Sequence, residues 1–424
     1  MSESELSRGT NQSGVRLYNE RLILSLIRKH GALPKAEIAR RTGLSAQTIS
    51  VIMRGLNGDE LVRREKRVRG NIGQPSVPFS LNKEGAFSIG LKVGRRSAEL
   101  VAIDFVGTVI NSLRKTYAYP TPELVLNFVS GGLSTLVDGF SKKQMARISG
   151  IGIAIPFELW NWADEIGAPD GAMDGWLDCD IRAEVGKICD WRVYVCNDAT
   201  AACAAELVFG VGAGHSDFLY YFVGSFVGGG LVLDGNLVTG RNGNAGALGP
   251  LPVPAKDGRT SRQLVQCASI YLLENQLATE GADPSAIWQS PDSWFNFGKP
   301  LDDWIDEAAD GLAYGSVAAL SIVDIEAVII DGAFPSGVRT RLVERVRKKF
   351  EASDRRGLSD ITIIEGSIGA PARSIGGACL PLLVNFARDR EVMFKYRNAE
   401  SETAADFAGA NPRLNPNNRT SIYP

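Results

Sequence analysis

A run of basic side chains near the N-terminus is the part of the sequence best suited to bind a charged ligand. Between Leu61 and Gly70 there are five basic residues and one acidic residue. Basic side chains spaced closely along one segment neutralise the phosphates of a nucleic acid and release its counterions. The turn residues Gly70, Gly73 and Pro75, followed by the alternating stretch 77–81, predict that this run forms a β-hairpin wing.

The segments before this run must position it, and their apolar spacing predicts three short helices. Residues 15–30 carry apolar side chains at near-helical spacing, and Pro34 and Lys35 open a second helix. A tight turn at Gly43 follows, and Ser45 is suited to cap a third helix over 46–56. Two short helices joined by a glycine turn are typical of a helix-turn-helix, whose second helix places polar side chains against base edges in the major groove.

The expected contacts to double-stranded operator DNA come from the third helix and from the wing. The third helix and its cap supply Ser45, Gln47, Thr48, Ser50 and Arg54, of which Gln47, Thr48 and Ser50 face the bases. The wing supplies Arg63, Arg64 and Lys66 for phosphates, and Arg69, Asn71 and Gln74 for the minor groove. An alternative interpretation is a three-helix interaction module that carries a charged hairpin.

Charge is distributed unevenly along the 424 residues. Residues 1–85 hold 15 Lys and Arg against 8 Asp and Glu, whereas the remainder holds 31 against 40. This asymmetry is expected of a small polyanion-binding module joined to a neutral or acidic body, although chance clustering on a solvated face would also produce it. The length allows two or three domains, and a hydrophobic content of 44% is ordinary for a globular protein.

Cysteine usage and hydropathy predict a soluble cytoplasmic protein without a membrane partner. The six cysteines have no C-x-x-C spacing, so we expect reduced thiols rather than disulfides or a zinc site. The longest uncharged run, 218–233, is too short and too rich in glycine to span a membrane, and the N-terminus lacks the apolar core of a signal peptide.

After Asn82 short apolar strands alternate with helices, which predicts an α/β body of two lobes. Strands are expected at 87–93, 148–155, 193–196 and 218–223. The expected division of the chain is a winged helix-turn-helix domain over 1–82, a small lobe over 83–197 completed by a helix near 385–398, a large lobe over 198–384, and a poorly ordered tail over 399–424.

Three body motifs, in this order and spacing, resemble those of ROK-type transcriptional regulators. They are 150–156, 197–202 and 240–246, and they follow the winged helix and the segment 8–12. The resemblance covers residues 8 to 395. It implies a multidomain protein, a winged helix fused to an α/β sugar-kinase fold of the actin/Hsp70-like (ribonuclease H-like) superfamily. It also implies a homodimer or homotetramer on DNA half-sites and a sugar-like effector between the lobes.

The sequence departs from the family's kinases where those enzymes bind phosphate. The D-x-G-G-T turn of the kinases is replaced by 92–96, in which Lys92 stands for the Asp and Arg95 and Arg96 occupy small positions. In the second glycine loop, 224–230, Phe226 fills space that phosphate would need, and the adenosine-side motif becomes 331–335. We therefore expect no ATP binding and no phosphoryl transfer. Alternatives are that Arg95 and Arg96 are exposed turn residues, or that they bind an anionic effector such as a sugar phosphate.

The glycines that remain in the second loop are explained by hairpin geometry. The family's zinc site is also rewritten, because its E-x-G-H motif becomes 247–250 and its C-L-E motif becomes 263–265. Zinc takes about four nitrogen or sulfur ligands, and this region cannot supply them. We expect no structural zinc and no other metal.

Of the sugar-contact positions that the resemblance implies, only Asn197 and Asp198 are kept, while the others become Ala172, Ala247, Pro250 and Val265. The resemblance makes Asp198 the vestigial general base, able at most to accept a hydrogen bond from a ligand hydroxyl. Alternatively, Asp198 caps the helix that follows it. The expected effector contacts are Pro156, Phe157, Asn197, Asp198, Gly246 and Ala247, with Trp160 and Trp162 as a stacking wall unless they are core aromatics.

Together these patterns predict a repressor of carbohydrate genes whose DNA affinity is controlled by an effector. Two alternatives remain open at this point. One is a working sugar kinase with an appended DNA-binding domain, and the other is a scaffold that only dimerises the DNA-binding domains and binds no small molecule.

Overall fold

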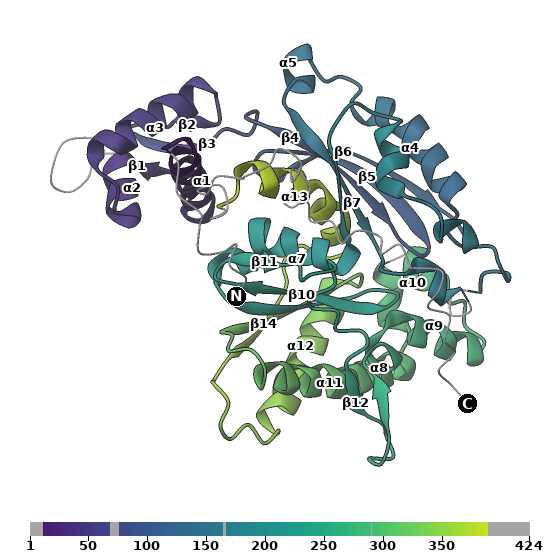
Figure 1. Ribbon diagram of the computed structural model, residues 1–424. Coiled ribbons are helices and arrows are strands. Elements are labelled where there is room, and N and C mark those ends of the chain that lie inside the picture. The colour runs from purple at the N-terminus through teal and green to yellow at the C-terminus, as the bar shows by residue number, and fades with distance from the viewer. Residues whose placement is uncertain (1–11, 68–75, 164–166, 290, 389–424) are drawn as a thin grey trace, which may run out of the picture.

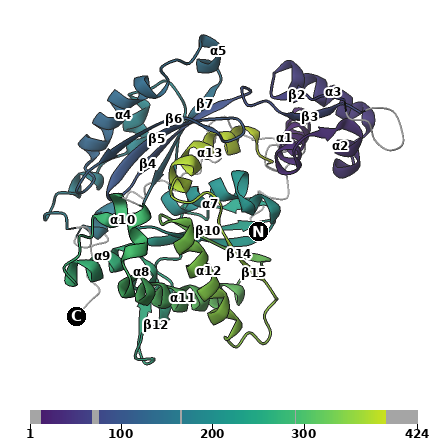
Figure 2. The ribbon, with the colours of Figure 1, turned by 180° about the vertical axis from the view of Figure 1, so that it is seen from behind.

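The computed structural model describes residues 12–67, 76–163, 167–289 and 291–388, which form a winged-helix domain and a two-lobed α/β body (Figure 1). Each lobe is built on a five-stranded sheet. Figures 1 and 2 both show two helices, α7 (Asp198–Phe209) and α13 (Ala372–Phe386), between the two sheets, and the winged-helix domain beside the small lobe.

The winged-helix domain has the predicted helices and wing strands. Its helices are α1 (Gln12–His30), α2 (Lys35–Thr42) and α3 (Ala46–Gly58), and its strands are β1 (Leu33–Pro34), β2 (Val62–Arg64) and β3 (Pro78–Leu81) in the order β1-β3-β2. Gly43, with φ +70°, makes the turn between α2 and α3, and this left-handed conformation favours glycine. Buried Ile23, Ile38, Ile49 and Met53 form the centre of the domain.

The small lobe is a mixed sheet with the strand order β6-β5-β4-β7-β8. Its strands are β4 (Phe87–Val93), β5 (Ser97–Asp104), β6 (Val109–Thr116), β7 (Ile148–Ile155) and β8 (Val193–Asn197). Helices α4 (Pro122–Leu136) and α6 (Ile181–Gly186) cover its outer face, and α13 covers the inner one (Figure 1). Short helices α5 (Lys142–Met145), η1 (Leu159–Trp162) and η3 (Asp174–Trp176) lie in its connections.

The large lobe has the strand order β11-β10-β9-β14-β15, and α7 covers its inner face. Its strands are β9 (Phe218–Val223), β10 (Val227–Leu233), β11 (Asn236–Val238), β14 (Ala327–Gly332) and β15 (Thr362–Glu365). On the outer side lie α8 (Val265–Ala268), α11 (Lys299–Leu320), α12 (Ser336–Glu351) and the strand pair β12 (Pro252–Pro254) and β13 (Ser261–Gln263). The shorter helices are η4 (Val211–Gly214), α9 (Ile270–Thr279), α10 (Ala286–Gln289) and η5 (Pro291–Asn296).

Helices α7 and α13 pack so closely that their backbones are nearly in contact. A Cβ at Gly376 would overlap the carbonyl of Ala201 in α7, and a Cβ at Gly152 in β7 would overlap the carbonyl of Gly377 in α13. Only glycine allows two backbones to approach this closely. The two sheets are therefore joined through α13, which contacts β4, β5, β7 and β8 on one side and α7 on the other.

Helix α13 also bears on the expected domain bounds. Among the described residues, the helix that packs on the inner face of the small-lobe sheet is Ala372–Phe386, which lies inside the range expected for the large lobe. Residues 389–398 lie outside the described part of the chain. The segment that forms α13 contains Gly376, Gly377 and Pro381, which are poor helix formers by themselves. Tertiary packing overrides that local preference, because the glycines permit the close contact.

Replacing Gly376 by Ala tests whether this contact limits the stability of the fold. We expect Gly376→Ala to lower the free energy of unfolding by about 1 to 3 kcal/mol, because the new methyl group would overlap the Ala201 carbonyl. Gly131→Ala is the matched control, because Gly131 lies on the exposed face of α4 with open space around it. It should raise the same quantity by about 0.5 to 1 kcal/mol, since Ala favours helices over Gly. Urea denaturation measures both, and equal shifts would contradict the packing argument.

Candidate DNA-binding surface and effector cleft

The exposed face of α3 presents a mixed polar and apolar row. Gln47 and Arg54 are exposed, Ser50 is half-buried, and Val51 is 52% exposed. Positions 47, 50, 51 and 54 share one helical face. Sequence analysis did not include Val51 among the expected DNA contacts. The signal was available, because Val51 lies four residues after Gln47 and therefore on the same face of the helix. A methyl-bearing side chain on such a face can contact the methyl group of thymine in the major groove.

Two of the expected contact residues are already used to begin α3. Ser45 Oγ accepts a hydrogen bond from the backbone N–H of Thr48 at 3.1 Å, and the two hydroxyls lie 2.9 Å apart. This is the predicted N-cap, which satisfies a backbone donor that the helix cannot satisfy itself. Ser45 and Thr48 are thus held together at the start of α3, and their contact with DNA stays a prediction, as does that of Gln47, Ser50 and Arg54.

Arg63 and Arg64 point to opposite faces of the wing strand β2, because successive side chains of a strand alternate between its two faces. Arg63 Nε donates to Glu65 Oε1 at 3.0 Å and to Ser80 Oγ at 3.2 Å. The Arg64 guanidinium lies over the ring of Phe79, 5.8 Å from its centroid, and Lys35 lies over the same ring at 5.8 Å. Lys66 is exposed, while Arg69, Asn71 and Gln74 lie outside the described residues.

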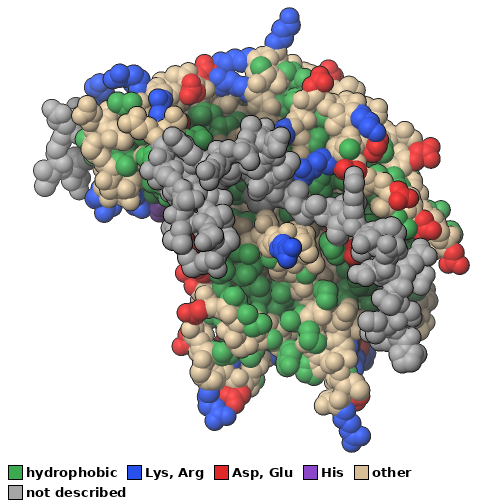
Figure 3. Space-filling view, viewed as in Figure 1, with side chains coloured by type: hydrophobic (Ala, Val, Ile, Leu, Met, Phe, Trp, Pro, Cys, Tyr) green, Lys and Arg blue, Asp and Glu red, His purple; other side chains and the backbone are tan. Residues whose placement is uncertain are grey.

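Lys35, at the start of α2, was not expected to contact DNA, although its position at the opening of that helix was visible in the sequence. It borders a surface hollow of about 280 Å³ together with Arg64 and Val77. In Figure 3 basic side chains lie along the margins of the winged-helix domain, while acidic ones are frequent along the margin of the small lobe near α4. The uneven distribution of charge along the sequence is therefore also visible on this face of the molecule.

The winged-helix domain is fixed to the body by Arg28 at the end of α1. Its Nη1 donates to the carbonyl of Phe105 at 2.8 Å, and its guanidinium lies 4.9 Å from the Phe105 ring centroid and 5.6 Å from that of Phe209. Burial lowers the pKa of Arg28 to about 10, which leaves it charged at neutral pH. A second contact joins Glu60, after α3, to Lys143 at 2.6 Å and Arg147 at 2.7 Å.

Asn197 and Asp198 have different tasks at the start of α7. Asn197 Oδ1 accepts from the N–H groups of Ala199 at 3.0 Å and Thr200 at 3.3 Å, so Asn197 is the cap and the alternative that Asp198 caps this helix is wrong. Asp198 is buried and accepts from Arg373 Nη1 at 3.1 Å. Sequence analysis missed Arg373, because its partner is 175 residues away and no local pattern marks it.

Lys92 forms a second buried ion pair beside the first. Lys92 and Glu99 are directly opposite each other on β4 and β5, with Nζ 3.0 Å from Glu99 Oε1 and 3.1 Å from Ser97 Oγ. Burial, with the nearby Arg373 charge, lowers the pKa of Lys92 to about 8. Two ion pairs therefore lie near each other, Asp198–Arg373 between α7 and α13 and Lys92–Glu99 between β4 and β5.

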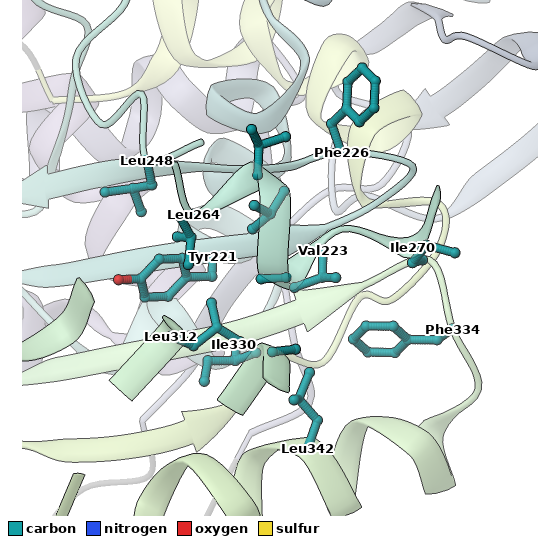
Figure 4. Packing of buried hydrophobic residues seen from close by; sticks show 14 of the residues in the cluster. Tyr221, Val223, Phe226, Leu248, Leu264, Ile270, Leu312, Ile330, Phe334 and Leu342 are labelled. Atoms are coloured by element: carbon teal, nitrogen blue, oxygen red, sulfur yellow. The ribbon is translucent and has the colours of Figure 1, made fainter. Parts of the chain in front are cut away.

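Arg95 and Phe226 join the two lobes between the turn after β4 and the turn after β9. The Arg95 guanidinium lies 3.8 Å from the centroid of the Phe226 ring, and Arg95 is only 8% exposed. The interpretation of Arg95 as an exposed turn residue is therefore wrong. Phe226 also contacts Trp162 of the small lobe at 4.8 Å and Tyr271 at 5.0 Å between ring centroids. Figure 4 shows Phe226 projecting away from the large-lobe core residues labelled beneath it.

The glycines that follow Phe226 serve helix packing. A Cβ at Gly228 would lie 2.7 Å from Cβ of Ala199, and one at Gly230 would lie 2.5 Å from Cβ of Cys203, both in α7. A Cβ at Gly229 would overlap the side chain of Leu248. None of the three has a positive φ. The explanation by hairpin geometry is therefore wrong, and close packing of α7 on β10 takes its place.

The remaining expected effector residues lie around the start of α7. Pro156 and Phe157 follow β7, whose last residue, Ile155, pairs with Asn197. Pro156 is buried and Phe157 is partly exposed. Gly246, with φ +73°, lies against β10, because a Cβ there would be 2.7 Å from Cα of Gly230; Ala247 after it is exposed. Pro156 and Phe157 thus follow the strand end that lies beside Asn197, whereas Gly246 lies against β10.

Protein groups surround Asp331 and Phe334, in the segment to which the resemblance assigns the adenosine-side motif. Asp331 is buried and accepts from the N–H groups of Gly369 at 2.7 Å and Gly332 at 2.9 Å and from Arg339 Nη1 at 3.0 Å. Burial raises the pKa of Asp331, and these donors oppose that rise. Phe334, also buried, packs against two tryptophans, with ring centroids 6.2 and 6.3 Å away.

The β12–β13 strand pair occupies the region in which the resemblance places the zinc site. Glu307 of α11 binds both Lys256 and Arg262 of this strand pair and its turn, which attaches them to the large lobe. Beside it lies an open cavity of about 990 Å³, bordered also by Asp310 and Lys349, which pair with each other. Among the described residues there is no group of three or more His, Cys, Asp or Glu that could hold a metal ion.

The fold and the site define a class of protein: a winged helix-turn-helix DNA-binding domain attached to a two-lobed α/β body of the actin/Hsp70-like type. The ROK family model matches residues 88–381, and a winged helix-turn-helix DNA-binding model matches residues 16–63. The chain belongs to the ROK family.

Similar proteins include transcriptional regulators. An uncharacterized protein, y4fQ, of Sinorhizobium fredii is 24% identical over 87% of this chain and 91% of its own length. The xylose repressor of Bacillus spizizenii is 24% identical over 63% of this chain and 68% of its own length. Among solved structures, a ROK family transcriptional regulator, a homolog of the E. coli MLC protein, has a TM-score of 0.60 at 18% identity, and the match covers 87% of this chain and 96% of that chain.

A kinase shares the fold of the body. The ROK family glucokinase from Streptomyces griseus, solved with glucose and AMPPNP, has a TM-score of 0.55 at 20% identity, and the match covers 69% of this chain and 98% of that chain. At this identity the likeness shows the fold alone. Within the described residues, no helix is both long and apolar enough to cross a membrane.

Truncating Phe226 tests whether it holds the lobes together. We expect Phe226→Ala to lower the free energy of unfolding by about 3 to 5 kcal/mol, because it removes a buried ring that both lobes contact. The control is Phe295→Ala, since Phe295 is 62% exposed; its effect should stay within about 0.5 kcal/mol. Chemical denaturation followed by tryptophan fluorescence measures both, and a loss at Phe226 no greater than at Phe295 would show that the ring does not join the lobes.

Proposed function

We propose that this protein is a sequence-specific DNA-binding repressor of carbohydrate uptake or catabolism genes, acting in the cytoplasm as a homodimer or homotetramer. A sugar-like effector bound between the lobes controls its affinity for operator DNA. The observation that supports this most is the path of α7 and α13, which begin together at the Asp198–Arg373 ion pair and end beside Arg28 and Phe105. The names of the xylose repressor and the MLC homolog agree with it.

The two helices connect the cleft to the DNA-binding domain as follows. α7 begins beside Asp198, and its last residue, Phe209, lies under the Arg28 guanidinium. α13 begins beside Arg373, and its last residue, Phe386, packs on Phe105 at 4.9 Å between ring centroids. A change of lobe closure that shifts either helix therefore changes the surface on which the winged helix rests. The effector releases DNA only to the extent that it binds the two arrangements unequally.

We propose further that the body does not transfer phosphoryl groups. Phosphoryl transfer needs a metal held beside the phosphates and backbone that approaches them closely. Lys92 stands where the kinases have the metal-site Asp, and the Arg95–Phe226 stack occupies both loops. A working kinase is the alternative, supported by the shared fold alone. ATP-dependent phosphorylation of any sugar by the pure protein would establish it.

The contacts proposed for the winged helix predict that two substitutions lower the affinity for DNA in different ways. An operator is first selected from random double-stranded DNA with the full chain. Arg64→Ala should weaken binding to the operator and to unrelated DNA alike, and should reduce the salt slope by about one, because Arg64 is assigned to a phosphate. Gln47→Ala should cost about 1 to 3 kcal/mol on the operator and little on unrelated DNA.

Fluorescence anisotropy at several salt concentrations gives both affinities and slopes. Lys299→Gln, which removes an exposed charge from the large lobe, is the control for the change in net charge. If Arg64→Ala lost only operator binding, its assignment to a phosphate would be wrong. Failure of the full chain to select any DNA sequence would overturn the proposed function itself.

Arg28 should couple the winged-helix domain to the body. We expect Arg28→Met, which keeps the stem of the side chain and removes the hydrogen bond to Phe105, to separate the unfolding of the two parts. Calorimetry should then show a winged-helix transition below that of the body. Lys29→Met, at the exposed neighbouring position, should keep the wild-type profile. One cooperative transition in Arg28→Met, unshifted from that control, would show that Arg28 does not join the domains.

A further inference from the structure

Two cations of the winged-helix domain lie against one buried aromatic ring. The Lys35 ammonium and the Arg64 guanidinium are each 5.8 Å from the centroid of the Phe79 ring. Arg64 is directly opposite Phe79 on β2, and Lys35 follows Pro34, the last residue of β1 on the other side of β3. The ring attracts both cations and holds two like charges near each other. An anion between them would relieve their repulsion.

Among the described residues, no carboxylate forms an ion pair with Lys35 or Arg64. The acidic side chains nearest along the chain have other partners. Glu37 binds two arginines of its own helix at 2.5 and 2.6 Å, and Glu65 binds the other arginine of β2 at 3.0 Å. The sequence of the segment 68–75, between β2 and β3, contains no Asp or Glu. Both cations are therefore available to a negatively charged ligand.

A surface hollow is bordered by both cations. It has a volume of about 280 Å³, and Phe79 and the exposed Ser76 also border it. This volume is several times the roughly 30 Å³ that one water molecule takes up in the liquid, so a phosphodiester group has room there. The hydroxyl of Ser76 can donate a hydrogen bond to a phosphate oxygen. The hollow therefore combines positive charge, a neutral donor and open space.

The position of the hollow indicates which anion it binds. It lies between the start of α2 and the strands of the wing, and α2 leads through the Gly43 turn into α3. In the proposed complex α3 occupies a major groove of DNA and the wing occupies the neighbouring minor groove, and one sugar-phosphate strand separates the two grooves. That strand passes between the helix-turn-helix and the wing. A phosphate of the DNA backbone is therefore the anion that reaches the hollow.

We propose that Lys35 and Arg64 together bind a single phosphate of the DNA backbone at this hollow. This inference rests on the proposed function and names the DNA group that the surface between α2 and the wing binds. Lys35 belongs to the helix-turn-helix and Arg64 to the wing, so one phosphate joins the two elements that read the DNA. Such a contact fixes the register of the protein on the duplex and carries no sequence information itself.

A double-mutant cycle on the full chain tests whether the two cations share a phosphate. Wild type, Lys35→Gln, Arg64→Ala and the double variant are titrated by fluorescence anisotropy on the selected operator and on unrelated DNA, at several salt concentrations. Each single variant should bind both DNAs about tenfold more weakly, because a charge-assisted hydrogen bond is lost and the shared site opens. The double variant should stay within about threefold of the weaker single variant, and the salt slope of all three should fall by about one.

Separate phosphates predict a different result. If each cation bound a phosphate of its own, the two losses would multiply to about a hundredfold and the slope of the double variant would fall by about two; either result overturns the proposal. An unchanged affinity in Lys35→Gln overturns it as well. Lys29→Gln is the matched control, because it removes an exposed lysine of the same domain that does not border the hollow, and it should keep the wild-type slope.

A scan of the DNA backbone identifies the phosphate directly. The selected operator is synthesised as a series of duplexes, each with one phosphate replaced by a neutral methylphosphonate. With the wild type, one replacement in each half-site, between the major groove read by α3 and the minor groove at the wing, should weaken binding about tenfold. With the double variant the same replacement should have no effect, while other sensitive positions stay sensitive. A double variant that keeps the wild-type pattern of sensitive positions overturns the proposal.

The proposed function and this inference can fail separately. Selection of an operator by the wild type, together with losses at Lys35 and Arg64 that multiply, would leave the proposed function standing and overturn this inference alone. Failure of the wild type to select any operator overturns both. Circular dichroism checks that each variant is folded. If the double variant is not, Lys35→Gln replaces it in the backbone scan, where retained sensitivity at the same phosphate counts against the site.

Discussion

The close contact between α7 and α13 is the constraint on which the rest of this structure depends. Because Gly376 lets the two backbones meet, one helix that covers the large-lobe sheet and one that covers the small-lobe sheet act as a single layer. That layer brings Asp198 and Arg373 together at one end. At its other end, Phe209 and Phe386 form part of the surface that receives Arg28 of the winged helix.

The ion pairs between the lobes follow from this arrangement. Asp198 and Arg373 are buried together where the two helices begin, and the buried Lys92 pairs with the half-buried Glu99 on β4 and β5. The Arg95–Phe226 stack adds a lobe-to-lobe contact that fills the space between the two hairpin turns.

The winged-helix domain and the body are joined through a polar anchor as well as an apolar surface. Apolar residues of the winged helix and of the small lobe form one continuous buried cluster, with Arg28 and Glu60 on its margin. An apolar contact alone would allow the domain to slide, whereas a directed hydrogen bond from a guanidinium fixes its orientation. In this chain the DNA-binding domain is therefore attached to the body by specific hydrogen bonds and ion pairs as well as by apolar packing.

The sequence by itself determined the elements whose signals are local. The periodicity of α1 to α3, the Ser45 cap, the wing strands and the apolar strands Phe87–Val93 and Ile148–Ile155 all follow from neighbouring residues, and the structure has them where they were predicted. Only the tertiary structure decided the rest. Arg373 has a partner far along the chain, Arg95 is buried by a ring from the other lobe, and the glycines of 228–230 and α13 are required by backbones that approach from elsewhere. Such contacts depend on how separate elements pack, and no short stretch of sequence records that packing.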